Sequence, residues 1–524
     1  MRDFIDATRR QTLVYDGGMG ATLEQFDLSL ERDYRLPGRC HEALVINRPD
    51  VIEGVHSSML DAGADVVETD TFQASRLKLG EWGLEDHTHE INVKAAQIAR
   101  RAAGEQRFVA GAIGPTGFLP ASDDPTLGRI SFAELAEVFA EQARGLIEGG
   151  VDLIIIETAQ DILELKAAVF GVRRAGTEAG RSVPIQCSVS LLPQGGKMLL
   201  GTDISSVLAT LEALRVDAIG LNCSTGPEDM RDAIRFLGEY SPVPVHCIPN
   251  AGLPLQGPNG ETIFPEQPEP LATVLGEFVE RYGVSIVGGC CGTTPAHIAA
   301  IAERVKDRNG AAPAPRPERR PVHVSSMIAA TPLVQAPRPT LIGERVNSQG
   351  SRKAKEMLLT DDYDGLLVVA EDQVTGGAHV LDICVALTER QDEAEQMRQV
   401  VKRVSLTQPA PIQVDSTEPE VIETALEQIP GRAIINSINL EAGRDKLDRV
   451  VPLARDHGAA VIALTIDEVG MAKTAERKLE IARRITGYCC DEHGLDPDAL
   501  IFDCLTFTLT TGDPEWRPSA VATI

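Results

Sequence analysis

Short apolar runs alternate with longer amphipathic segments through the first half of the chain. Eight of these runs are rich in β-branched residues and apolar at nearly every position, which predicts strands buried on both faces. The segments between them, for example residues 131–150, repeat their apolar positions at helical spacing. The expected strands span residues 12–17, 64–72, 107–115, 152–158, 184–190, 217–224, 244–250 and 285–292.

Eight successive strand–helix units predict a TIM (β/α) barrel, an α/β fold in which a parallel sheet closes on itself. A doubly wound open sheet is the alternative. Active sites of TIM barrels lie at the C-terminal ends of the strands. Glycines and polar residues follow these ends here, as in DGG at 16–18, ETDTF at 68–72 and GGCCG at 288–292. We therefore expect the candidate site at this end of the barrel.

The same pattern restarts in the second half of the chain and predicts a second TIM barrel in tandem with the first. Only six strands are visible before the chain stops at Ile524. Six units cannot close an eight-stranded barrel, so we expect either a fragment or a barrel completed by residues that are not given. The expected strands span residues 340–347, 379–385, 411–416, 433–439, 460–467 and 500–505.

A segment rich in Pro, Ala and Arg separates the two halves and lacks sustained periodicity. This composition predicts an extended linker that is partly packed on a neighbouring domain. The predicted organisation is a first barrel over residues 1–307, a linker over residues 308–339 and an incomplete second barrel over residues 340–524.

Charge and cysteine content narrow the classes of function. The chain has 77 acidic and 50 basic residues, a net charge of −27, which disfavours nucleic acid or an anionic membrane as the main partner. We see neither a signal peptide nor an apolar run of about 18 residues, the length that predicts a membrane span. A cytoplasmic location is therefore expected, where the ten cysteines stay reduced and available to a metal.

Three cysteines carry the strongest candidate chemistry. Cys223 lies in GLNCS, and Cys290 and Cys291 lie in GGCCGTTP; each motif ends an apolar run in a turn that contains glycine or small residues. Three thiolates suit a tetrahedral zinc ion with an open fourth position, where a substrate can bind. The alternative is three unrelated buried thiols, because cysteine is among the most buried residue types.

Several motifs around these cysteines resemble a known family. DGGMGATLE at 16–24, GLNCS and GGCCGTTP resemble the homocysteine S-methyltransferase domain. IGERVN at 342–347, PIQVDST at 411–417, AIINSIN at 433–439 and IFDCLTFTLTTGD at 501–513 resemble a methyltetrahydrofolate-binding domain. Together they are similar to the N-terminal part of the cobalamin-dependent methionine synthase family.

The resemblance implies a homocysteine site in the first barrel. The homocysteine sulfur would take the fourth position on a zinc ion held by the three cysteines. The amino-acid end would lie at Asp16, Gly17, Gly18 and Glu157, because a carboxylate suits an ammonium group and glycine amides suit a carboxylate. The alternatives are a turn-capping role for Asp16 and a solvated strand end for Glu157.

The resemblance also implies a pterin site in the second barrel, at Asp415, Asn436 and Asp503. Carboxylates accept the paired donors of a pterin, and an amide side chain both donates and accepts. We expect Asn436 to be catalytic, as part of an Asp–Asn–water network that protonates N5 of the folate before the methyl group leaves. Strand-end or helix-cap roles remain the alternative for Asp382 and Asp467. The further candidate contacts are Glu344, Asn347, Asp382 and Asp467.

The expected function is methyl transfer to homocysteine, which forms methionine. Methyltetrahydrofolate would be the donor, and cobalamin, bound by a module outside this chain in cis or in trans, would carry the methyl group. One alternative is a cobalamin-independent homocysteine methyltransferase that uses betaine or a sulfonium donor. Others are a homocysteine methyltransferase fused to a folate reductase and a module that binds zinc or folate without catalysis.

Overall fold

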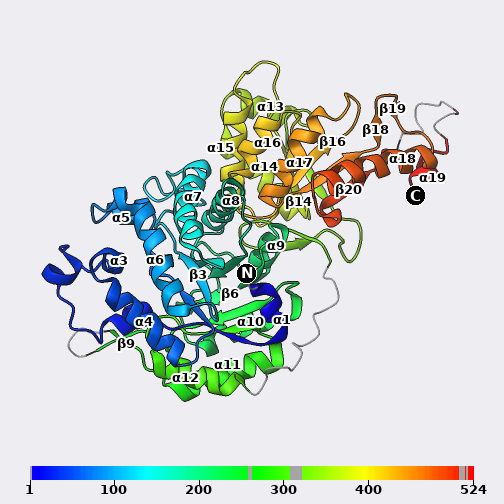
Figure 1. The fold of residues 1–524 in the computed structure, drawn as a ribbon. Helices are drawn as coiled ribbons and strands as arrows, with labels where there is room; N and C mark the ends of the chain where they lie inside the picture. The colour runs from blue at the N-terminus through cyan, green and yellow to red at the C-terminus, as the bar shows by residue number, and fades with distance from the viewer. Residues whose placement is uncertain (1–2, 258–261, 307–320, 507–513, 515–516) are drawn as a thin grey trace. The chain divides into compact units, whose positions relative to one another are not determined.

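Eight parallel strands form the sheet of the first unit, Met1–Arg320, in the computed structural model (Figure 1). The first strand pairs with the last, and a parallel bridge between Tyr15 and Val66 joins the first strand to the second, so the sheet closes on itself. The predicted TIM barrel is confirmed, and the open-sheet alternative is wrong. The strands are β1 (Leu13–Val14), β2 (Val66–Glu68), β3 (Phe108–Ile113), β4 (Leu153–Ala159), β5 (Ile185–Val189), β6 (Ala218–Asn222), β7 (Val245–Ile248) and β10 (Ile286–Val287).

A long helix follows each of these strands. Local sequence sets their ends: Ser131 and Glu134 form a capping box at the start of α7, and Gly150 ends that helix with a φ of 95°. The helices are α4 (Pro49–Asp61), α6 (Thr88–Ala103), α7 (Phe132–Gly149), α8 (Ile162–Glu178), α9 (Ile204–Ala213), α10 (Pro227–Tyr240), α11 (Pro268–Tyr282) and α12 (Pro295–Lys306). Shorter elements are α1 (Phe4–Arg10), α2 (Met19–Leu23), α3 (Leu44–Asn47), α5 (Arg76–Gly80) and the hairpin of β8 (Leu255–Gln256) and β9 (Thr262–Ile263).

The structure describes residues 3–257, 262–306, 321–506, 514 and 517–524. Within these ranges, we find no helix with both the length and the apolar character to cross a membrane.

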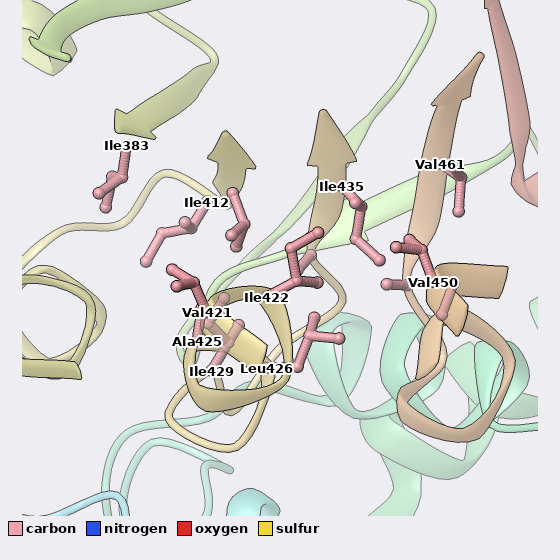
Figure 2. Packing of buried hydrophobic residues seen from close by; sticks show 14 of the residues in the cluster. Ile383, Ile412, Val421, Ile422, Ala425, Leu426, Ile429, Ile435, Val450 and Val461 are labelled. Atoms are coloured by element: carbon pink, nitrogen blue, oxygen red, sulfur yellow. The ribbon is translucent and has the colours of Figure 1, made fainter. Parts of the chain in front are cut away.

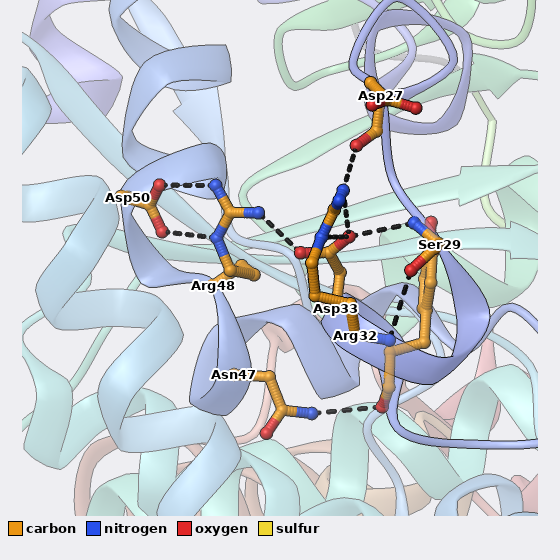
Figure 3. Close-up of polar contacts among 8 residues, drawn as sticks. Asp27, Ser29, Arg32, Asp33, Asn47, Arg48 and Asp50 are labelled. Atoms are coloured by element: carbon orange, nitrogen blue, oxygen red, sulfur yellow. Dashed lines mark hydrogen bonds and ion pairs between the residues drawn. The ribbon is translucent and has the colours of Figure 1, made fainter.

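Ion pairs hold the long connection between β1 and α4 (Figure 3). Asp33, whose side chain is 1% exposed, accepts from Arg32 and, at 2.6 Å, from Arg48. The backbone amide of Ser29 donates to the same carboxylate at 2.8 Å. The Arg32 hydrogen bond, with those of Ser29 and Arg48, holds the pKa of Asp33 far below its usual value. These contacts stabilise the part of this connection between α2 and α4, which contains no strand.

Six parallel strands form the sheet of the second unit, Pro321–Ile524, in chain order. Among the described residues, the end strands β13 and β20 do not pair with each other, as the prediction of an incomplete barrel expects. The strands are β13 (Ile342–Asn347), β14 (Val380–Cys384), β15 (Ile412–Asp415), β16 (Ile434–Ile438), β17 (Ala460–Leu464) and β20 (Leu500–Asp503). The helices are α13 (Arg352–Leu359), α14 (Tyr363–Thr375), α15 (Glu393–Thr407), α16 (Pro419–Leu426), α17 (Asp445–His457), α18 (Ala475–Thr486) and α19 (Ser519–Thr523), and β18 (Ile466–Asp467) pairs with β19 (Gly470–Met471).

Aliphatic side chains fill the space between this sheet and its helices. Figure 2 shows Ile422 of α16 directed toward the strands that carry Ile412 and Ile435. These side chains are at most 2% exposed. Aromatic residues make up only 4% of the chain, so the core depends on the interlocking of branched aliphatic side chains.

Part of the segment predicted to be an extended linker, residues 308–339, instead forms a β-hairpin. Its residues 308–320 lie outside the described residues. Residues beyond them form a hairpin of β11 (His323–Ser325) and β12 (Ala330–Pro332), which belongs to the second unit. Ser325 exchanges backbone and side-chain hydrogen bonds with Arg432, and Val324 packs with the starts of β14, β16 and β17. The hairpin forms because Val324 and Ser325 are buried against the sheet.

Candidate functional site

The three cysteines meet at the C-terminal end of the first barrel. Cys223 directly follows β6, and Cys290 and Cys291 lie just beyond β10. Their three sulfur atoms lie within 4.8 Å of one another, and the sulfurs of Cys223 and Cys291 are 3.8 Å apart. Cys223 and Cys290 are partly buried and Cys291 is exposed, so the cluster has one side open to solvent.

The end of β7 and the two residues that follow it hold the cysteine backbone in place through three hydrogen bonds. Cys223 has a positive φ of 60°, an uncommon conformation for a residue other than glycine, and its hydrogen bond to the strand end stabilises it there. The three bonds run from Cys223 N to Ile248 O (3.1 Å), from Cys290 N to Pro249 O (2.8 Å) and from Cys291 N to Asn250 Oδ1 (3.1 Å).

The three thiols interact through hydrogen bonds and charge. Hydrogen bonds from Cys290 and Cys291 lower the pKa of Cys223 to about 3, and the bond to Cys223 raises the pKa of Cys291 to about 12. This hydrogen bonding favours the ionised form of Cys223 and the protonated form of Cys291. A divalent cation would displace the thiol protons and hold all three sulfurs as thiolates.

Buried carboxylates surround the same strand ends. Asp16 follows β1, and Glu157 lies near the end of β4. Their side chains are only 5% and 7% exposed. Asp16 Oδ2 accepts a hydrogen bond from the backbone amide of Glu68 at 3.0 Å. Burial, followed by the charge of Glu68, raises the pKa of Asp16 and of Glu157 well above the usual values. Burial raises the pKa of Glu68 to about 7.

The glycines of the DGG motif lie against the cysteine loop. The amide of Gly18 donates to Thr293 Oγ1 at 3.1 Å, and this hydroxyl donates to Cys290 O at 2.7 Å. A Cβ atom at Gly18 would lie 2.7 Å from Cys290 O, and one at Gly17 would lie 3.0 Å from Thr293 Oγ1. The close approach of the two loops therefore requires glycine at position 18.

A second polar cluster lies at the C-terminal end of the second sheet. Asn347 Nδ2 donates to Asp382 Oδ2 at 2.8 Å and to Asp415 Oδ2 at 3.1 Å. Gln413 Nε2 donates to the other oxygen of Asp382 at 2.6 Å. Burial and the neighbouring Asp382 raise the pKa of Asp415 to about 6. Asn436 lies opposite Asp415 in the strand register, and burial raises the pKa of Asp382 while Asn347, Gln413 and Asn436 act to lower it.

The other predicted pterin contacts lie apart from these hydrogen bonds. Glu344 is exposed on β13, although its charge contributes to the raised pKa of Asp415. Asp503 is exposed at the end of β20 and accepts from the amide of Leu505 at 2.8 Å. Asp467 is buried and forms ion pairs with Arg477 and, at 3.2 Å, with Arg484. Among the described residues, no hydrogen bond joins Asp467 or Asp503 to the cluster around Asn347.

Two family models match this chain, one in each unit. Residues 13–305, more than half of it, match the family model described as homocysteine S-methyltransferase. The chain belongs to the homocysteine S-methyltransferase family. Residues 343–524 match the model described as pterin binding enzyme, so the two kinds of domain that the motifs predicted are confirmed.

Curated relatives match this chain along its whole length. It is 41% identical over 534 aligned residues to the methionine synthases of Mycobacterium leprae and Mycobacterium tuberculosis, and the alignments cover 100% of this chain. The chain spans 43% and 44% of the lengths of these two relatives. Among solved structures, the metallated form of the homocysteine methyltransferase MmuM from Escherichia coli is 25% identical, with a TM-score of 0.45 over 56% of this chain and 97% of that one.

Some residues of these clusters were absent from the sequence-based prediction. Glu68 was visible as an acidic residue at a strand end within ETDTF. Asn222 and Gln413 gave no comparable signal, because a polar residue inside an apolar strand has no obvious partner until the sheet has formed. The site roles of the predicted residues stay predictions.

Proposed function

We propose that this chain transfers a methyl group to homocysteine and so forms methionine, with methyltetrahydrofolate as the original donor. The convergence of three thiols at the active end of a homocysteine S-methyltransferase barrel supports this proposal most directly. The pterin-binding match of the second unit favours a folate donor over betaine or a sulfonium compound.

The donor set suits zinc. A tetrahedral zinc ion with Zn–S distances of about 2.3 Å separates its sulfur ligands by about 3.8 Å. Cys223 and Cys291 already have this separation, so little movement is needed for these two sulfurs to bind one ion. When bound, zinc deprotonates the substrate thiol and keeps it nucleophilic at neutral pH. The partly open cluster leaves room for that fourth sulfur.

The carboxylates of the first barrel suit the amino-acid end of homocysteine. Asp16 and Glu157 are buried near the cysteines, where burial and then the negative charge of Glu68 raise the pKa of both. An incoming ammonium group would supply the missing positive charge and favour their ionised forms. The amide of Gly17 is the candidate donor for the substrate carboxylate; the amide of Gly18 donates to Thr293 Oγ1 and would have to exchange that partner for the substrate.

The cluster of Asn347, Asp382, Asp415 and Asn436 suits a pterin ring. Its carboxylates accept the paired N–H donors of the pterin, and its amides both donate and accept. Cobalamin, bound by a module outside this chain in cis or in trans, would carry the methyl group from folate to homocysteine. The cytoplasmic location expected from the sequence is part of this proposal.

Methionine formation from homocysteine with free methylcobalamin, before and after zinc removal, tests the proposal. We expect product only from the zinc-loaded chain, with activity restored when zinc is returned. A chain that holds one zinc ion and forms no methionine from methylcobalamin would contradict a cobalamin-linked reaction. Product from betaine or a sulfonium donor in the same assay would then support the alternative methyltransferase.

A further inference from the structure

One buried amide side chain connects the cysteine cluster to the proposed ammonium site. Asn222 is the last residue of β6, directly before Cys223, and is 1% exposed. Its Oδ1 accepts from Thr158 N (2.8 Å) and Ser188 Oγ (2.7 Å); its Nδ2 donates to Glu157 Oε2 (3.0 Å) and Thr158 Oγ1 (2.8 Å) and lies 3.9 Å from Cys290 Sγ.

These partners fix the orientation of the amide. A backbone N–H donates to the side chain, so the atom that faces Thr158 N must be the oxygen. The NH₂ group then has to face Glu157 and Cys290. It has two hydrogens for three acceptors, and a carboxylate and a thiolate are stronger acceptors than a hydroxyl. Both hydrogens are therefore drawn to Glu157 and Cys290 when these groups are ionised.

We propose that Asn222 is a positioning residue that holds Glu157 against the ammonium group of the substrate and links this carboxylate to the sulfur of Cys290. The inference rests on the proposed function and extends it to substrate selection. A substrate that carries both a thiol and an α-ammonium group would satisfy the two ends of this link. A thiol without the ammonium group would leave Glu157 buried and uncompensated.

The surroundings of Glu157 support this role. Burial disfavours its ionised form, and the Asn222 hydrogen bond opposes that effect. Without the amide, Glu157 would lose a donor that both fixes its rotamer and favours its charge.

Two thiols that differ only in the ammonium group provide the test. Homocysteine and 4-mercaptobutyrate share the thiol, the chain length and the carboxylate. Their dissociation constants are measured by calorimetric titration of the zinc-loaded protein, so the readout does not depend on turnover. We expect the wild-type protein to bind homocysteine at least about tenfold more tightly, from one charge-assisted hydrogen bond. In Asn222→Ala, this ratio should fall about tenfold, with the affinity for 4-mercaptobutyrate within about threefold of wild type.

Ser188→Ala is the matched control, because it removes one bond to Asn222 Oδ1 and leaves all three Nδ2 contacts in place. Its ratio should stay at the wild-type value. In a Glu157→Gln background, Asn222→Ala should change the ratio no further, since the two residues act through one contact. Equal weakening of both thiols in Asn222→Ala would overturn the proposal.

The outcomes separate the inference from the proposed function. A wild-type protein that binds both thiols equally would contradict an ammonium site at Glu157. A wild-type protein that discriminates, with Asn222→Ala discriminating equally well, would contradict the role of Asn222 alone. Asn222→Ser serves as a second variant, with zinc content measured first. Loss of zinc from both variants would overturn the proposal in favour of a purely structural role.

Discussion

The sulfur atoms of Cys223 and Cys291 lie 3.8 Å apart, although the two residues are 68 positions apart in the chain. The barrel produces this proximity, because β6 and β10 both pair with β7 and all three strands run in parallel. Their C-terminal ends therefore reach the same rim. The geometry of the cluster therefore depends on the register of three strands as well as on the loops that follow them.

Replacement of any one cluster cysteine should remove the metal. In Cys223→Ser, Cys290→Ser or Cys291→Ser, a hydroxyl replaces a thiolate and the zinc affinity should fall by more than about a hundredfold. Metal analysis after dialysis measures the zinc content of each variant. Cys490→Ser is the control, since this partly buried thiol lies in the second unit, outside the cluster. One zinc ion retained in all three cluster variants would contradict the assigned ligand set.

Gly18→Ala should disturb the cysteine loop without touching a cysteine. The added Cβ would lie 2.7 Å from Cys290 O, a backbone atom, so one of the two loops must shift. We expect roughly a tenfold or greater loss of zinc affinity or of methyl transfer. Gly54→Ala on α4 is the control, because a Cβ there has nothing within 4 Å. Wild-type zinc binding and activity in Gly18→Ala would show that the close approach is unimportant.

The fold and the main candidate site could be predicted from the sequence because both depend on local patterns. Continuous apolar runs define strands, and the strand ends place Cys223, Cys290 and Cys291 on one rim. Asn222 could not be assigned in the same way. Its partners belong to β4, β5 and the cysteine loop, and only the formed barrel brings these segments together.

In the second unit too, the sequence predicts which residues lie at strand ends but not which partners they contact. Asn347 and Asp415 end β13 and β15, and they meet Asp382 of β14, the strand between them. Asp467 also comes after a strand of the sheet, β17, but it lies in the hairpin of β18 and β19. Its carboxylate forms ion pairs with two arginines of α18. The sequence contains those arginines, yet helical spacing alone does not reveal which carboxylate they contact.

Folate binding should strengthen as the pH rises through about 6. Burial raises the pKa of Asp415 to about 6, and only the ionised carboxylate accepts both donors of a pterin. Titration of the chain with methyltetrahydrofolate from pH 5 to pH 8 measures this change. A dissociation constant that is flat across this range would contradict a direct contact with Asp415.

The same shift gives a prediction for stability. Because the folded-state pKa lies above the unfolded value of about 3.9, the native state binds more protons between about pH 4 and 6. The contribution of Asp415 to the free energy of unfolding should therefore fall as the pH rises through that window. Denaturant unfolding of wild type and Asp415→Asn at several pH values isolates this contribution by difference.

Asn436→Ala should slow methyl transfer more than it weakens binding. We expect the amide to belong to the network that protonates N5, a role that matters as the methyl group leaves. Loss of such proton transfer typically costs about a hundredfold or more in rate, whereas the dissociation constant should change less than about threefold. Single-turnover methyl transfer to free cob(I)alamin and equilibrium folate binding measure the two quantities. Asn439→Ala, on the loop after the strand, is the control; equal losses in rate and binding would count against a catalytic role for Asn436.

Asp467→Asn should destabilise the second unit and spare folate binding. The carboxylate is 1% exposed and pairs with both Arg477 and Arg484, so its neutralisation leaves two partly buried guanidinium groups without their shared partner. We expect the melting temperature to fall by roughly 4–8 °C. Glu468→Gln is the control, because this exposed carboxylate pairs with Arg484 at 3.1 Å on the surface and its loss should change the melting temperature little. A tenfold loss of folate affinity in Asp467→Asn at an unchanged melting temperature would instead make Asp467 a ligand contact, as the sequence-based prediction had it.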